Sequence, residues 1–161
     1  MFEDRERPVS PAAKVHPSGA EYATWPSRLV AEIVDGFVVL VILQLVAALL
    51  PTAVDIVAIG GGFIYNGMLD GGPHGQTLGK RLLRIRVIDD STGDLIGPQR
   101  GMLRALPPLA FGVLGLLSPA TFLLGILAAL LDGLWPLWQP RRQTWHDMVA
   151  GSVVVRATPA G

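Results

Sequence analysis

The chain has 161 residues, of which 50% are hydrophobic and only 16% are charged, and its formal net charge at pH 7 is zero. Its mean hydropathy of +0.46 indicates a membrane protein, because about a quarter of the residues are charged in a typical soluble domain. The charge balance gives no indication of nucleic-acid binding, and the absence of cysteine excludes disulfides and thiolate chemistry.

The basic residues avoid the two longest apolar stretches of the chain. All 13 Lys and Arg residues lie outside residues 29–79 and 105–140. A cation at the centre of a bilayer costs about 2.5–3.5 kcal/mol, so this distribution predicts a membrane domain, which we place at residues 27–161. Residues 1–26 are polar, partly acidic and rich in Pro and Ala, which predicts a flexible cytoplasmic tail rather than a cleaved signal peptide.

The apolar regions divide into four predicted transmembrane helices. Pro51 ends the first, and so few residues separate it from the second that the two form a tight hairpin. The next apolar region is too long for one span, and the turn-forming pair Ser118-Pro119 divides it. The predicted spans are residues 28–50, 53–69, 102–117 and 120–138. A re-entrant segment that begins at Pro107 and Pro108 is the alternative.

A four-span topology places both basic clusters, residues 80–104 and 141–142, on one side of the membrane. The positive-inside rule assigns that side, together with both termini, to the cytoplasm, and the membrane is expected to be a bacterial plasma membrane. Residues 85–88 and 152–155 have strand-like sequences and are expected to pair beneath the membrane. The predicted fold class is therefore an all-α membrane protein, a four-transmembrane-helix bundle with a small cytoplasmic β-like loop element.

The loop after the second predicted span begins with a short basic amphipathic helix. Its characteristic residues are Gly75, Gln76, Thr77, Gly79, Lys80 and Arg81. A phosphate-binding loop is excluded, because Arg81 stands where Ser or Thr is required and no strand precedes the segment. We expect instead that Lys80, Arg81 and Arg84 contact anionic lipid headgroups.

Three ionisable residues share one face of the first predicted helix. Arg28, Glu32 and Asp35 are spaced i, i+4 and i+7, which places Asp35 about 10 Å along the helix axis from Arg28. In one interpretation they form a structural cluster in which Arg28 neutralises a carboxylate. In the other, Asp35 binds a proton or a cation, a common role of intramembrane carboxylates. Asp132 is expected to join Asp35 in one polar pocket if the first and fourth helices pack together.

Small residues recur at intervals of four in the second and fourth predicted spans, a spacing typical of closely packed membrane helices. The candidates for helix packing are Gly62, Gly125, Ala129 and Gly133. Packing within the molecule is the first interpretation, and contact with an oligomer or a partner protein is the second. The three histidines are not at metal-ligand spacing and no nucleophile pattern occurs, so we expect no metal, no cofactor and no enzymatic activity.

Three segments, in order along the chain, resemble the RDD family of bacterial membrane proteins, which is named for one arginine and two aspartates. Arg28 and Asp35 resemble the first two letters. Residues 75–82 resemble the loop signature of the family, and residues 143–151 resemble its C-terminal signature, which makes Asp147 the third letter. The resemblance implies a role in the membrane that is suspected to be transport, without a defined molecular function.

Two functions remain open at this point. In the first, the chain transports an ion or a small solute as a homo-oligomer, with Asp35 as the membrane-embedded carboxylate, Arg28 beside it and Asp147 at the cytoplasmic mouth. In the second, it is a non-catalytic accessory or assembly subunit of a larger membrane complex, and the same residues hold the fold. The expected partners are membrane lipids together with further copies or other membrane-protein subunits. The two functions differ in whether Asp35 faces a hydrated interior or is fully paired.

Overall fold

The computed structural model describes residues 15–50 and 54–157 as a mostly helical protein with one small sheet. Helix α1 begins after Thr24, whose hydroxyl accepts a hydrogen bond from the Ser27 backbone amide. In chain order the elements are α1 (Trp25–Leu49), α2 (Val54–Asp70), α3 (Leu78–Leu82), β1 (Ile85–Asp89), α4 (Gly97–Leu117), α5 (Pro119–Leu134), the 3-10 helix η2 (Trp135–Leu137), α6 (Trp145–Val149) and β2 (Ser152–Arg156).

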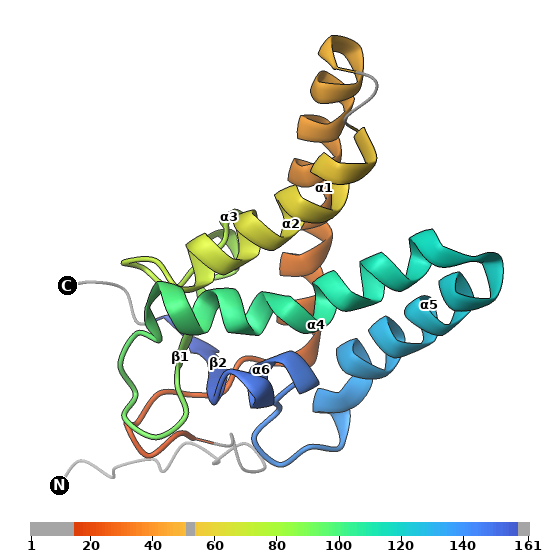
Figure 1. Ribbon diagram of the computed structural model, residues 1–161. Helices are drawn as coiled ribbons and strands as arrows, with labels where there is room; N and C mark the ends of the chain where they lie inside the picture. Colours follow the sequence, from red (N-terminus) through yellow and green to blue (C-terminus); the bar gives the residue numbers. More distant parts are fainter. Residues whose placement is uncertain (1–14, 51–53, 158–161) are drawn as a thin grey trace, which may run out of the picture.

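The long helices form two hairpins that diverge from a common base. Figure 1 shows α1 and α2 rising from the base, whereas α4 and α5 extend to the right, so that the free ends of the two hairpins are far apart. The hairpins are joined mainly where α2 packs along α4. The helices approach closely there because a Cβ at Gly101 would lie only 2.3 Å from the Gly67 carbonyl oxygen.

Three of the helices are long and apolar enough to cross a membrane by length and composition: Trp25–Leu49, Gly97–Leu117 and Pro119–Leu137. Helix α2 has 17 residues and is not among them, so the predicted count of four spans is supported for three. The four long helices overlap the four predicted spans, but α4 begins at Gly97, five residues before the predicted start of the third span. Pro107 and Pro108 lie inside α4, which continues to its end at Leu117.

The distribution of apolar side chains is that of a membrane protein. The long helices expose large apolar residues, among them Leu49 at 78% and Leu123 at 66%. The most closely packed apolar core lies instead around the sheet at the base of the molecule, where Ile85, Val87 and Val155 are almost fully buried. Helices that expose so much apolar surface require an apolar surrounding, which a bilayer supplies.

The base, which we call the cap, consists of α3, α6, the sheet, the loop between β1 and α4 (residues 90–96) and residues 15–24. Strands β1 and β2 are antiparallel with Ile88 opposite Val153, so the predicted pairing of the two strand-like segments is confirmed. Part of the predicted tail belongs to this cap: Tyr22 forms a bridge to Val155, and Ala23 is fully buried. The boundary placed at residue 26 is therefore wrong for residues 15–24, because these add backbone hydrogen bonds to the edge of the sheet. The first 14 residues of that tail lie outside the described residues.

Candidate functional site

Six buried charged residues meet where the two hairpins enter the cap. They come from five different helices. Five of them form a continuous chain of ion pairs that runs Arg28, Asp147, Arg104, Asp70 and Lys80. Asp35 is linked to this chain through α3, because it accepts hydrogen bonds from Thr77 and Gly79, which precede Lys80 on the same segment. We call this group the basal network; its members are Arg28, Asp35, Asp70, Lys80, Arg104 and Asp147. Three cations and three carboxylates balance to a formal charge of zero. Buried charges are tolerated when they are paired in this way, so the network holds the helices in one arrangement.

Asp147 in α6 ties three helices together. Its side chain is fully buried, and it accepts hydrogen bonds from Arg28 Nη2 at 2.6 Å and from Arg104 Nη2 at 2.8 Å. It also forms a capping box with Thr144, whose backbone amide donates to Asp147 Oδ2 at 3.0 Å. Burial by itself raises the pKa of Asp147, but the guanidinium groups of Arg28 and Arg104 hold this pKa well below its usual value. Asp147 is therefore an ionised clamp between α1, α4 and α6.

Asp70, at the end of α2, continues the network to the loop helix α3. Lys80 Nζ lies 2.8 Å from each carboxylate oxygen of Asp70, and Arg104 pairs with Asp70 from the other side. Arg104 thus bridges Asp70 and Asp147. The predicted headgroup contact is wrong for Lys80, whose residue is only 3% exposed because its ammonium is held by Asp70. Arg81 and Arg84 are exposed, and their contact with lipid headgroups stays a prediction.

The carboxylate of Asp35 accepts three hydrogen bonds from other parts of the protein. It accepts from the Thr77 hydroxyl at 2.5 Å, from the Gly79 backbone amide at 2.8 Å and from the Tyr65 hydroxyl at 2.8 Å. The residue is only 3% exposed. In the described structure Asp35 is thus a docking point for α3 on α1, paired rather than facing a hydrated interior.

The loop signature of the sequence has a physical explanation in this docking. A Cβ at Gly79 would lie 2.1 Å from the Ala31 carbonyl oxygen, so only glycine lets α3 approach α1 this closely. Gly75 has a φ of +62° and accepts a hydrogen bond from the Val87 backbone amide at 2.7 Å. Gln76 Nε2 donates to the Ile85 carbonyl at 2.8 Å. The signature residues therefore join the loop to both α1 and β1.

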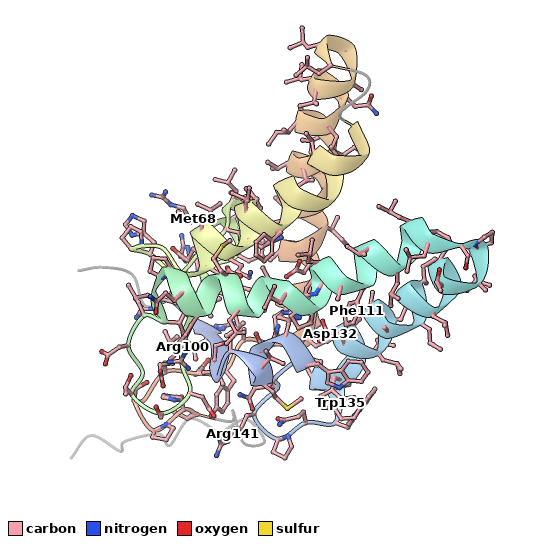
Figure 2. All side chains as sticks on the ribbon, in the orientation of Figure 1. Met68, Arg100, Phe111, Asp132, Trp135 and Arg141 are labelled. Atoms are coloured by element: carbon pink, nitrogen blue, oxygen red, sulfur yellow. The ribbon has the colours of Figure 1, made fainter. Side chains whose placement is uncertain are left out.

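Asp132 does not share a pocket with Asp35, so that prediction is wrong. Asp132 lies near the end of α5 (Figure 2). Its carboxylate accepts from His146 Nδ1 at 2.5 Å and from the His146 backbone amide at 3.1 Å, which ties the end of α5 to α6. Asp35 bonds only to residues of α2 and α3 and of the turn between them. The start of α1 lies beside Asp132, because Trp25 Nε1 donates to the Gly133 carbonyl at 2.8 Å. Asp35 is ten residues further along α1, which is about 15 Å along the helix axis.

Glu32 shares a helix face with Arg28 and Asp35 but lies outside the charge balance of the network. Its side chain is 53% exposed, and the closest cation is Lys80, with its Nζ at 4.0 Å. None of the described residues donates a hydrogen bond to Glu32. The three residues predicted as one cluster on α1 thus have three different surroundings: an ion pair, a hydrogen-bonded dock and an exposed carboxylate.

Helix packing uses some of the predicted small residues. Gly125 packs closely, because a Cβ there would lie 2.6 Å from the carbonyl oxygen of Phe111, which faces α5 (Figure 2). A Cβ at Gly62 or Gly133 would have no described atom within 4 Å, and Ala129 is exposed. Within the described part of the molecule, helix packing at these three positions therefore does not require a small side chain.

Two features of this site were not predicted: the roles of Asp70 and Arg104, and the close crossing of α2 and α4. The spacing of Gly67 and Gly71 by four residues is the pattern that would have indicated this crossing. No local pattern indicates the pair of Asp70 and Arg104, which are 34 residues apart. Within the described residues there is no group of three His, Cys, Asp or Glu side chains that could hold a metal ion.

Two grooves border the network on the membrane side. The larger, about 640 Å³, lies between α1 and the α4–α5 hairpin, and the smaller, about 290 Å³, lies between α1, α2 and α4. Glu32 and His146 line both grooves.

Comparison with known proteins finds one match, to the family model described as RDD family, over residues 22–151. The matched range contains the whole basal network and all the helices. No curated protein and no solved structure matches the chain.

Proposed function

Because this chain belongs to the RDD family and carries apolar helices suited to a membrane, we propose that it is a non-catalytic accessory or assembly subunit of a larger membrane complex. The observation that carries the proposal is the closed pairing of Asp35. A carboxylate that moves an ion or a proton has to exchange a protein partner for that ion or for water. Asp35 has three protein donors and almost no exposed surface.

The charge balance of the basal network supports the same role. Each carboxylate of the network is matched by donors from another helix, so loss of a partner would leave a buried charge unpaired. A network of this kind is suited to holding two hairpins at a constant angle. The surface that remains available in the membrane is then apolar, as expected for helices that contact other subunits.

The orientation belongs to the proposal as well: four crossings with the cap and both termini in the cytoplasm of a bacterial cell. The support is that Arg81, Arg84 and Arg141 are exposed on the cap or beside it.

The orientation can be tested by cysteine labelling. The chain has no cysteine, so a single cysteine substitution reports the accessibility of its position without background. We expect a membrane-impermeant maleimide added to intact cells to label Leu117→Cys, at the free end of α4, and not Thr92→Cys in the cap. The opposite pattern would invert the orientation, and labelling of both would contradict the four crossings.

The proposed function is tested by purifying the protein from its native membrane in a mild detergent. We expect stoichiometric recovery of other membrane-protein subunits, and no flux of Na⁺, K⁺ or H⁺ when the isolated protein is placed in vesicles. Asp35→Asn is expected to reduce the yield of folded protein, because an amide cannot accept the three hydrogen bonds equally well. Asp94→Asn, which changes an exposed carboxylate of the cap, is the matched control and should leave the yield unchanged.

The transport function would be established by the opposite set of results. In that case the isolated protein catalyses ion flux by itself, and a folded Asp35→Asn variant loses the flux while keeping its oligomeric state. Either finding would overturn the assignment of Asp35 to the scaffold.

A further inference from the structure

The larger groove has the size and composition of a site for one small amphiphilic molecule. Its volume of about 640 Å³ lies within the roughly 300–1,000 Å³ typical of ligand sites. Apolar residues of three helices line it, including Leu29 of α1, Phe111 of α4 and Ile126 of α5. Because α1, α4 and α5 are the helices suited to crossing a membrane, a molecule from the bilayer has direct access to this groove.

The polar end of the groove is formed by Arg28, Glu32, Asp132 and His146. Arg28, the arginine at this end, uses both terminal nitrogens for hydrogen bonds within the protein: Nη1 donates to the Arg142 carbonyl at 2.6 Å, and Nη2 donates to Asp147. His146 Nδ1 is held by Asp132. Among the charged groups at this end, Glu32 is the one to which no described residue donates a hydrogen bond. A ligand that enters this end of the groove therefore meets the negative carboxylate of Glu32.

The two cations near Glu32 both pair more closely with buried carboxylates: Lys80 with Asp70, and Arg104 with Asp70 and Asp147. The Lys80 ammonium is 4.0 Å from Glu32 but only 2.8 Å from both oxygens of Asp70, and its residue is 3% exposed. A molecule that completes this site has to donate hydrogen bonds and carry positive charge. A fatty acid or an anionic lipid would bring a second negative charge beside Glu32, which is unfavourable.

From this complementarity we propose that the groove binds an amine-headed phospholipid of the bilayer, with its ammonium on the Glu32 carboxylate and an acyl chain along Phe111 and Ile126. The ammonium supplies three N–H donors to an acceptor that lacks them. The acyl chain covers apolar surface that the splayed hairpins leave open. This site is independent of the proposed subunit role, because it uses neither the pairing of Asp35 nor a partner protein.

The test compares two phospholipids with identical acyl chains, one with an ethanolamine and one with a choline headgroup. The choline ammonium is methylated and has no N–H to donate. The full-length protein is purified from vesicles that contain equal amounts of both lipids, and the retained lipids are counted by native mass spectrometry. We expect about a tenfold preference for the ethanolamine lipid, as for loss of a charge-assisted hydrogen bond.

Three variants assign the preference to the groove. Glu32→Gln should bring the ratio of the two lipids to about one while lipid is still bound. Ala129→Phe, which fills the groove from α5, should remove both lipids, and Leu123→Phe, at an exposed position of α5 outside the groove, should behave like the wild type. Equal retention of both lipids by the wild type, or a preference that survives Glu32→Gln, overturns the proposal. The proposal is also overturned if the wild type is a dimer and Ala129→Phe dissociates this dimer without loss of bound lipid. That result would mean that a second copy of the chain fills the groove. The measurement uses the isolated protein, so it does not depend on whether other subunits are recovered from the native membrane.

Discussion

Replacing Asp147 with Asn is expected to lower the free energy of unfolding by about 3–5 kcal/mol, the cost of breaking a buried ion pair by removing one partner. The side chain is fully buried, and it is the shared acceptor for Arg28 and Arg104. The neutral amide leaves both guanidinium groups short of negative charge in a site with almost no water. It also weakens the capping box with Thr144 at the start of α6.

The measurement for Asp147→Asn is reversible denaturant unfolding in mixed micelles, compared with the wild type. Asp94→Asn is the matched control: Asp94 is an exposed carboxylate in the cap, and its removal is expected to change the free energy of unfolding by no more than about 0.5 kcal/mol. A loss below about 1 kcal/mol for Asp147→Asn would mean that the two arginines find other acceptors, and that Asp147 does not clamp the helices.

Gly79→Ala is expected to destabilise the protein by about 1–3 kcal/mol, although it adds only one methyl group. The new Cβ would lie 2.1 Å from the Ala31 carbonyl oxygen and 3.0 Å from the Asp35 carboxylate carbon. Both neighbours belong to α1, so α3 has to move away from this helix. That movement lengthens the hydrogen bonds from Thr77 and Gly79 to Asp35.

The matched control for Gly79→Ala is Gly36→Ala, one residue from Asp35 in α1. No described atom lies within 4 Å of a Cβ at Gly36, so alanine there should be neutral or stabilise the helix by up to about 1 kcal/mol. The same unfolding titration reports both variants. If Gly79→Ala is as stable as the wild type, α3 does not approach α1 as closely as described, and the explanation of the loop signature is wrong.

The features that depend on neighbouring residues could be predicted from the sequence. Apolar runs and the exclusion of Lys and Arg located the long helices, with Ser118 and Pro119 marking the turn between α4 and α5. The strand-like sequences of residues 85–88 and 152–155 indicated the two strands. Arg28 and Asp35 together with the motifs at residues 75–82 and 143–151 indicated the family, which the match confirms. These features can be predicted because the hydrophobic effect and backbone propensities act locally along the chain.

The pairing of the buried charges could not be predicted from the sequence, because it follows from how the helices pack. Arg28 and Asp147 are 119 residues apart in the chain, yet their side chains lie 2.6 Å from each other. Lys80 lies in a basic segment typical of lipid-contacting residues, but in the structure its side chain is buried and paired with Asp70. Asp132 pairs with His146 and not with Asp35. The energy of an ion pair depends on distance in space and on the removal of water, and both are set by how the helices cross, so the partner of a buried charge cannot be read from its neighbours in the sequence.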